Sequence, residues 1–280
     1  MKKKLDANRG KLTTAQIAQG MSAAAQNARR LAGDAVALLE AHRFPTAASL
    51  AILSIEESGK ISILRSLSLA TTVDEVSDAW KDYRSHTQKN VAWLLPQLVV
   101  AGARKLDDLR PLFEKDSDHP YVLDQIKQLG FYTDCLGRAH WSTPDSAIDE
   151  SLAEMLVKVA SLLAGKHEYT KIEVDLWVEH IGPVSKKEHA LMKQALVNWY
   201  AAMQKMGLVP EGANEMEQFV RDGFPGSGAG RPDLTHKEEF DRREAILAPL
   251  VLARVGIDSF LFTYLDWTIQ SPASHSIHSL

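Results

Sequence analysis

The sequence predicts an all-α protein, built as a helical bundle with a C-terminal helical extension. Apolar residues recur at the three- and four-residue spacing of a helix through most of the chain, and prolines and glycines separate these periodic segments. No run of β-branched or aromatic residues alternates with polar ones between turn residues, so no strand is predicted. The chain has 280 residues, 45% hydrophobic and 24% charged, which is the composition of a globular protein.

The first two helices follow from capping and proline positions. Thr13 or Thr14 can cap a helix that runs to about His42, because a threonine hydroxyl accepts a backbone N–H of the first turn. The next helix is expected from roughly Pro45 to Leu69, since proline fits a first turn, where its missing N–H costs nothing. One apolar stripe of the first helix is expected to face the core: Ile17, Met21, Ala24, Ala28, Leu31, Ala35 and Leu38.

A third helix is expected to start after Thr72 and to continue to about Leu95, where the following proline ends it. The pattern then loosens between about residues 104 and 144. Within that stretch, only residues 121–129 are predicted to form a short helix, and residues 130–137 are predicted to form a loop.

Helical periodicity returns in the second half of the chain. One helix is predicted over residues 145–163 and another over residues 185–206. Ser185 and Glu188 have the spacing of a capping box, which would start the second of these helices.

The last part of the chain is predicted to contain a glycine-rich linker at residues 223–232 and a helix over residues 235–255. We place a domain boundary in the segment between residues 165 and 184. This division gives a helical bundle at residues 13–165 and a C-terminal helical extension at residues 185–270.

Charge and cysteine content exclude several classes of site. The formal net charge of −4 and the pI of about 6.2 provide no global positive field, so any RNA must be held by a local cationic cleft. The single cysteine, Cys135, excludes an internal disulfide and a cysteine-based zinc site, and the ten histidines lack metal-ligand spacing. We therefore expect no metal ion and no cofactor.

The apolar segments predict a cytoplasmic protein without a membrane span. The longest of them, residues 91–103, is interrupted by Pro96 and Gln97 and is too short to cross a bilayer. The basic start at residues 1–4 has no apolar core behind it, so it does not form a signal peptide.

A charged pair on the second predicted helix is the first candidate site. At about 100° per residue, Glu56 and Lys60 share the apolar stripe of that helix, so we expect them to be buried as a pair. Gly59 lies between them, and a glycine inside a helix indicates close approach of another backbone or of a ligand. Both a structural pair that fixes the register of a bundle and a functional polar site fit this pattern.

The third predicted helix carries a second polar cluster. Asp82, His86 and Lys89 are spaced four and three residues apart, which places them on one helical face. Lys81 and Arg84 lie nearby, and such cations can hold a phosphate and stabilise the charge that develops on it. Neighbouring cations also disfavour the imidazolium form, which suits a general base near neutral pH. A solvated polar face gives the same pattern, so both interpretations stay open.

Four segments occur in a familiar order, at residues 43–60, 86–89, 127–134 and 141–144. The most specific part is the Glu-Glu-x-Gly-Lys element at residues 56–60, in the helix that starts with proline. This order resembles the AbiV family of abortive-infection proteins, a branch of the HEPN superfamily. The resemblance covers about residues 20–165.

The resemblance implies a HEPN-like bundle that forms a homodimer, with polar active-site residues facing each other across the seam. HEPN proteins are commonly metal-independent ribonucleases or toxins in antiphage defence. Such enzymes use the RNA 2′-hydroxyl as nucleophile, so a histidine transfers protons while arginine or lysine stabilises the phosphorane. Carried over by position, the catalytic residues would be Glu56, Lys60, His86 and Lys89, and the RNA-binding residues Arg84, Lys81, Lys127 and Tyr132, with Asp134 as a neighbour.

One departure from the family pattern keeps a second function open. The common HEPN nuclease signature places an arginine before the histidine with four to six residues between them, whereas Arg84 precedes His86 by one residue. Lys81 has the right spacing but lacks the planar guanidinium fork. The alternatives are a non-catalytic defence protein that binds translation machinery or a phage protein, and a structural protein. Expected partners are a second copy, RNA, and a phage-encoded activator or an antitoxin.

Overall fold

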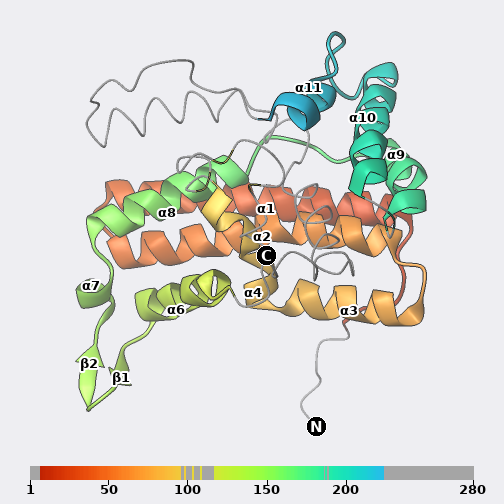
Figure 1. Ribbon diagram of the computed structural model, residues 1–280. Coiled ribbons are helices and arrows are strands. Elements are labelled where there is room, and N and C mark those ends of the chain that lie inside the picture. Colours follow the sequence, from red (N-terminus) through yellow and green to blue (C-terminus); the bar gives the residue numbers. More distant parts are fainter. Residues whose placement is uncertain are drawn as a thin grey trace, which may run out of the picture.

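The structure is a computed structural model that confirms the predicted all-α fold (Figure 1). Helices form most of the described chain, and a short β-hairpin is the only sheet within it. The described residues are 7–95, 98, 103, 108, 117–185, 187 and 189–223.

Two long helices form the centre of the molecule. α1 (Thr14–Glu40) begins with a capping box at Thr13, as the sequence predicts. α2 (Phe44–Leu69) follows after a short turn and runs back along α1. Alanines on both helices allow a close approach, and the Ser54 hydroxyl donates a hydrogen bond of 2.8 Å to the carbonyl of Ala28.

The prediction of one continuous third helix over residues 72–95 is wrong, because the helix is interrupted at Ser85. Three elements replace it: α3 (Val73–Arg84), the one-turn helix α4 (His86–Lys89) and the 3-10 turn η1 (Val91–Leu94). The Ser85 hydroxyl accepts the backbone N–H of Gln88, so it starts a new helix at the point where the old one ends. The break separates Asp82, on α3, from His86 and Lys89, which stay together on α4.

α6 (His119–Phe131) confirms the short helix predicted over residues 121–129. After it, a hairpin replaces the loop predicted at residues 130–137: β1 (Asp134–Leu136) pairs antiparallel with β2 (His140–Ser142). Strands of three residues are too short to leave an alternating pattern, which explains why the sequence did not predict them. The hairpin projects from one end of the bundle in Figure 1.

The helix predicted over residues 145–163 consists of two helices, α7 (Pro144–Ala147) and α8 (Glu150–Leu163). The Asp149 side chain accepts the backbone N–H of Leu152 at 2.8 Å, so α8 has a cap of its own. α8 packs its apolar face on α2.

The remaining described elements are α9 (Lys171–Ile181), the 3-10 turn η3 (Gly182–Val184), α10 (His189–Lys205) and α11 (Glu215–Asp222). Neither α9 nor α11 is predicted by the sequence. The predicted capping role of Ser185 is wrong, because its hydroxyl donates a hydrogen bond to the Gly182 carbonyl and α10 begins at His189. The capping partner predicted for it, Glu188, lies outside the described residues.

The arrangement of these helices buries α2 on all sides. In Figure 1, α8 lies along one side of the α1–α2 pair, α3 and α6 lie along the other, and α9 and α10 stand at one end. A helix that is apolar around its whole circumference is a core helix. Glu56 and Arg65, two buried charged residues of α2, must therefore find their partners inside the protein.

Several predictions for the end of the chain fall outside the described part. These are the linker at residues 223–232, apart from Gly223, and the last helix at residues 235–255. The division into units at residues 13–165 and 185–270 stays a prediction. Among the described helices, none combines the length and the apolar character that a membrane span requires.

Candidate functional site

Glu56 is the centre of the candidate site. Its side chain is 4% exposed, and two lysines from other elements neutralise it. The Lys127 ammonium of α6 lies 2.5 Å from Glu56 Oε1, and the Lys89 ammonium of α4 lies 3.5 Å from Oε2. Lys127 also contacts Asp124 Oδ1 at 2.6 Å. Two carboxylates and two ammonium groups therefore balance one another in an enclosed space.

His86 connects this buried cluster to the surface. Its Nδ1 lies 2.7 Å from Glu56 Oε2, while 55% of its side chain is exposed. The break at Ser85 makes this contact possible, because His86 becomes the first residue of α4 and α4 packs on α2. A buried carboxylate that orients an exposed imidazole is the arrangement that proteins use to prepare a general base.

Two glycines allow the helices that carry these side chains to approach α2. A Cβ at Gly59 would lie 2.0 Å from the carbonyl oxygen of Lys89, so the predicted close approach of another backbone is confirmed. On α6, a Cβ at Gly130 would lie 2.2 Å from the Ser49 hydroxyl. The glycines therefore set the distance at which the two lysines meet Glu56.

The two lysines differ in how their surroundings affect the pKa. Burial lowers the pKa of Lys89, and Glu56 compensates this effect only in part. Burial acts on Lys127 as well, but its contacts with Asp124 and Glu56 outweigh the desolvation and raise the pKa of this lysine. Lys127 is therefore the firmly charged partner of Glu56, and Lys89 the more easily deprotonated one.

The cluster also contains three groups of the kind that bind metal ions. Ligand atoms of Glu56, His86 and Asp124 lie within 4.8 Å of one another. The Lys127 ammonium contacts both carboxylates, so it takes the position where a cation would be attracted. The residues therefore fit an internal ammonium better than a metal ion.

Comparison with protein-family models identifies the bundle that carries this site. Residues 16–165 match the HEPN_AbiV model, described as AbiV, which covers more than half of the chain. The chain belongs to the AbiV family of HEPN proteins. The match contains α2, α4 and α6, the elements that supply Glu56, His86, Lys89 and Lys127. Searches of curated proteins and of solved structures found no match to this chain.

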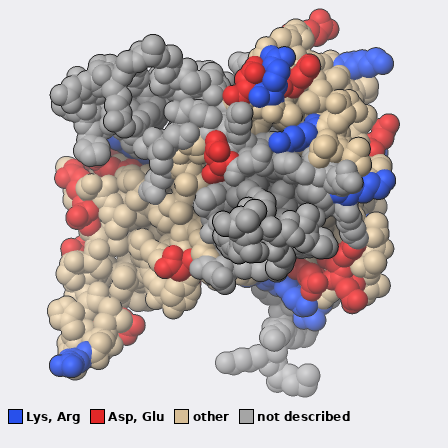
Figure 2. All heavy atoms as spheres, in the orientation of Figure 1, with Lys and Arg blue, Asp and Glu red and all other residues tan. Residues whose placement is uncertain are grey.

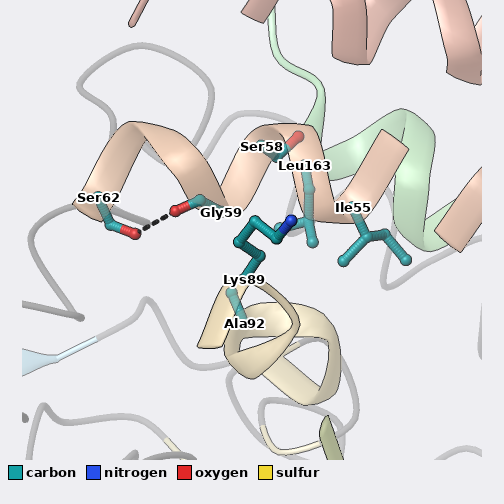
Figure 3. Close-up of a pocket in the computed structure, with 7 residues that line it drawn as sticks. All are labelled: Ile55, Ser58, Gly59, Ser62, Lys89, Ala92 and Leu163. Carbon is teal, nitrogen blue, oxygen red and sulfur yellow. Dashed lines mark hydrogen bonds between the residues drawn. The ribbon is translucent and has the colours of Figure 1, made fainter. Parts of the chain in front are cut away.

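A small pocket lies beside the AbiV-family site, between α2, η1 and α8 (Figure 3). The Lys89 side chain reaches across it from below α2, and the pocket is otherwise walled by apolar and small residues. The Ser58 hydroxyl, which lines it, has no hydrogen-bond partner among the described residues. The lining residues are Ile55, Ser58, Gly59, Ser62, Lys89, Ala92 and Leu163.

The predicted pairing of Glu56 with Lys60 is wrong, although Glu56 is buried as expected. Lys60 forms an ion pair with Glu57 and lies over the Tyr83 ring at 5.4 Å. The reason is tertiary: Lys127 arrives from α6 to pair with Glu56, which leaves Lys60 to a neighbour on its own helix. The Lys60 side chain keeps 19% exposure.

Lys81 and Arg84 make their contacts elsewhere. Lys81 is 72% exposed and pairs with Asp78 at 2.6 Å, while Arg84 donates hydrogen bonds to the backbone carbonyls of Trp80 and Asn8. The break at Ser85 separates both from His86. On the face shown in Figure 2, the basic side chains are scattered, and the described part of this face carries no broad basic patch.

Tyr132 and Asp134 lie at the hairpin. Tyr132 follows α6, is 62% exposed and contacts the Phe131 ring. The Asp134 carboxylate accepts the backbone N–H of Cys135. Neither has a contact with Glu56 or His86 among the described residues, so both belong to the projecting hairpin and not to the buried cluster.

Asp124 is a site residue that the sequence did not predict. It lies three residues before Lys127 on α6, and this i,i+3 spacing of opposite charges was the available signal. A second buried cluster was missed as well. In it, Arg65 pairs with Glu173 at 2.6 Å, and His167 contacts the same carboxylate at 2.8 Å.

Proposed function

We propose that this AbiV-family protein is a metal-independent ribonuclease that arrests host growth in antiphage defence. The observation that supports the proposal is the Glu56–His86 pair, with a buried carboxylate 2.7 Å from an imidazole that is half exposed. The ammonium of Lys127 between two carboxylates supports a reaction that needs no metal ion.

The chemistry follows from the orientation of the His86 ring. Nδ1–H donates to Glu56, which leaves the Nε2 lone pair free to take the proton of an RNA 2′-hydroxyl. The 2′-oxygen then attacks the adjacent phosphorus and the bond to the 5′-oxygen breaks. Water supplies a proton to the leaving oxygen, and the imidazolium returns its own proton to water. The products are a 2′,3′-cyclic phosphate and a 5′-hydroxyl.

The cations divide into two roles. Lys89 and Lys127 are 7% and 5% exposed, so they pair with Glu56 inside the protein and cannot reach a phosphate on the surface. Lys60, which is 19% exposed, is the cation on α2 that can approach a phosphate near His86. This division differs from the expectation that Lys89 is a catalytic residue and that Lys127 binds RNA.

The proposal is tested by incubating the purified protein with tRNA and total RNA, with and without EDTA. We expect cleavage that EDTA does not affect and that leaves 2′,3′-cyclic phosphate ends. His86→Ala should abolish cleavage while the melting temperature stays close to wild type. The matched control is His140→Ala, since His140 is an exposed histidine of β2 outside the site. Cleavage by His86→Ala at the wild-type rate would exclude His86 as the base.

A binding function is the second candidate, and the hairpin region supports it. Tyr132 and Trp141 are 62% and 67% exposed, an unusual exposure for large aromatic side chains. Such a surface suits contact with translation machinery or a phage protein. If growth arrest needs this surface, Trp141→Ser should relieve the arrest in cells without changing RNA cleavage in vitro.

We also infer that the bundle forms a homodimer, and that a phage-encoded activator or an antitoxin controls it. A two-fold seam would place two copies of the site close together and build a local basic cleft, which the net charge of −4 does not otherwise provide. Light scattering should give twice the mass of one chain at micromolar concentration. A monomer mass would contradict the dimer.

A further inference from the structure

The Lys127 ammonium stands close to both partners in the Glu56–His86 pair. It lies 2.5 Å from Glu56 Oε1 and 3.2 Å from His86 Nδ1. In a neutral imidazole, one nitrogen carries the proton and the other carries the lone pair. Nδ1 therefore either donates to Glu56 or accepts from Lys127, and it cannot do both.

The two arrangements have opposite consequences at the surface. When Nδ1–H donates to Glu56, the exposed Nε2 has a lone pair and can act as a base. When Nδ1 accepts from Lys127, Nε2 carries the proton and no base faces the solvent. Among the described residues, Nε2 has no hydrogen-bond partner that would decide between them.

Asp124 is placed to decide between these arrangements. Its Oδ1 lies 2.6 Å from the Lys127 ammonium, which is closer than Nδ1 of His86. The contact is an ion pair, so charge attraction holds it. Asp124 also balances the charge of the cluster, because Glu56 and Asp124 together match Lys89 and Lys127.

We infer that Asp124 is a positioning residue, which attracts the Lys127 ammonium in competition with Nδ1 and so keeps His86 in the tautomer whose Nε2 is free. Asp124 touches neither the substrate nor the ring and acts through Lys127. The inference rests on the proposed function only for its effect on catalysis. The tautomer itself is a property of the unbound protein.

Removing the charge of Asp124 should release Lys127 toward the ring. In Asp124→Asn, Glu56 is the one carboxylate left beside the Lys127 ammonium. Donation from Lys127 to His86 Nδ1 then competes better with the remaining ion pair. Long-range 15N NMR of the histidine rings shows which nitrogen carries the proton, and the spectrum of His86→Gln identifies the signals of His86. We expect Nδ1–H in the wild type and a shift toward Nε2–H in Asp124→Asn.

Cleavage assays with the same variants give the second readout. RNA cleavage by Asp124→Asn should fall roughly 10- to 100-fold, the scale for losing a group that orients a histidine, with little change in KM. Asp124→Glu should restore both the tautomer and the rate. Asp145→Asn, which removes an exposed carboxylate from α7, is the control for net charge.

The two readouts separate the inference from the proposed function. An unchanged tautomer in Asp124→Asn would overturn the positioning role, whatever the cleavage rate. A shifted tautomer in a protein whose wild type does not cleave RNA would support the positioning role and reject the ribonuclease. A variant that loses rate with an unchanged tautomer would show that Asp124 affects cleavage by another route, which also overturns the inference.

Discussion

The molecule buries two charge clusters along the same helix, one around Glu56 and one around Arg65. They lie nine positions apart on α2, or about 13.5 Å along the axis. Both contain a buried ion pair with side chains less than 6% exposed, and in both a histidine contacts the carboxylate. They differ in what surrounds the charges and in how far the histidine reaches the surface.

The Arg65 cluster is sealed by aromatic rings. The guanidinium lies between 5.1 and 5.6 Å from the ring centres of Tyr169, Trp177 and Trp199, and its histidine, His167, is 17% exposed. The corresponding histidine of the Glu56 cluster, His86, is 55% exposed. Burial of a charge therefore does not mark a functional site by itself. The distinguishing feature is an exposed titratable group that the buried charge orients.

The largest expected effect tests whether the Arg65 cluster is purely structural. Glu173→Ala leaves a buried guanidinium without its carboxylate, which costs about 3–5 kcal/mol of unfolding free energy. The loss is measured by urea denaturation. Asp175→Ala, which breaks an exposed pair with Lys171 on the same helix, should cost no more than about 1 kcal/mol. If Glu173→Ala loses no more unfolding free energy than Asp175→Ala, the Arg65 cluster does not stabilise the fold and the comparison fails.

A substitution at Gly59, which lies between the clusters on α2, should disturb the Glu56 cluster selectively. Gly59→Ala pushes a methyl group against the Lys89 backbone, and overpacking of this kind costs about 1–3 kcal/mol. Gly33→Ala in α1 meets nothing within 4 Å and should stabilise the protein by up to about 1 kcal/mol. Thermal denaturation compares the two variants. If both stabilised the protein, α4 would not be fixed against α2 as closely as the structure places it.

The pH dependence of stability should separate the two lysines of the Glu56 cluster. Because burial lowers the pKa of Lys89, the unfolded chain binds more protons than the folded one between that lowered pKa and 10.5. Stability from Lys89 therefore rises with pH in this window, by at most about 1.4 kcal/mol per pH unit. The contribution of Lys127 to stability has the opposite sign. Because its pKa is raised, Lys127 stabilises the folded protein below pH 10.5, and this stability is lost only above that pH.

Lys89→Met should remove the alkaline rise, which urea titrations at several pH values between neutral and 10 measure directly. The matched variant is Lys171→Met, which removes an exposed lysine outside the cluster. An equal slope in Lys89→Met and wild type would show that Lys89 is not desolvated in the folded protein.

The smallest effect concerns Lys60. Because Lys60 pairs with Glu57 and is partly exposed, Lys60→Ala should cost about 1 kcal/mol or less. Lys127→Ala should cost about 3–5 kcal/mol, since it leaves both Glu56 and Asp124 without their shared cation. Chemical denaturation of Lys60→Ala and Lys127→Ala identifies which lysine is the partner of Glu56. A larger loss for Lys60→Ala would restore the pairing that the sequence predicts.

Several features were available from the sequence because they are local. Helical periodicity and the Thr13 cap predict the first two helices, and the position of Glu56 on an apolar stripe predicts its burial. Gly59 indicates the close approach of a backbone, because a glycine inside a helix is costly without such a reason. The Glu-Glu-x-Gly-Lys element predicts the family, which the match to residues 16–165 confirms.

Tertiary structure decided the partners and therefore the site. The break at Ser85 depends on a balance of about 1 kcal/mol between one hydroxyl cap and one more helical turn, which local periodicity cannot resolve. Lys127 reaches Glu56 across 71 residues of chain and Glu173 reaches Arg65 across 108, so no spacing rule connects them. A buried charge demands a partner, but the sequence does not say which of many cations will meet it. Only the packing of α4 and α6 against α2 makes that choice.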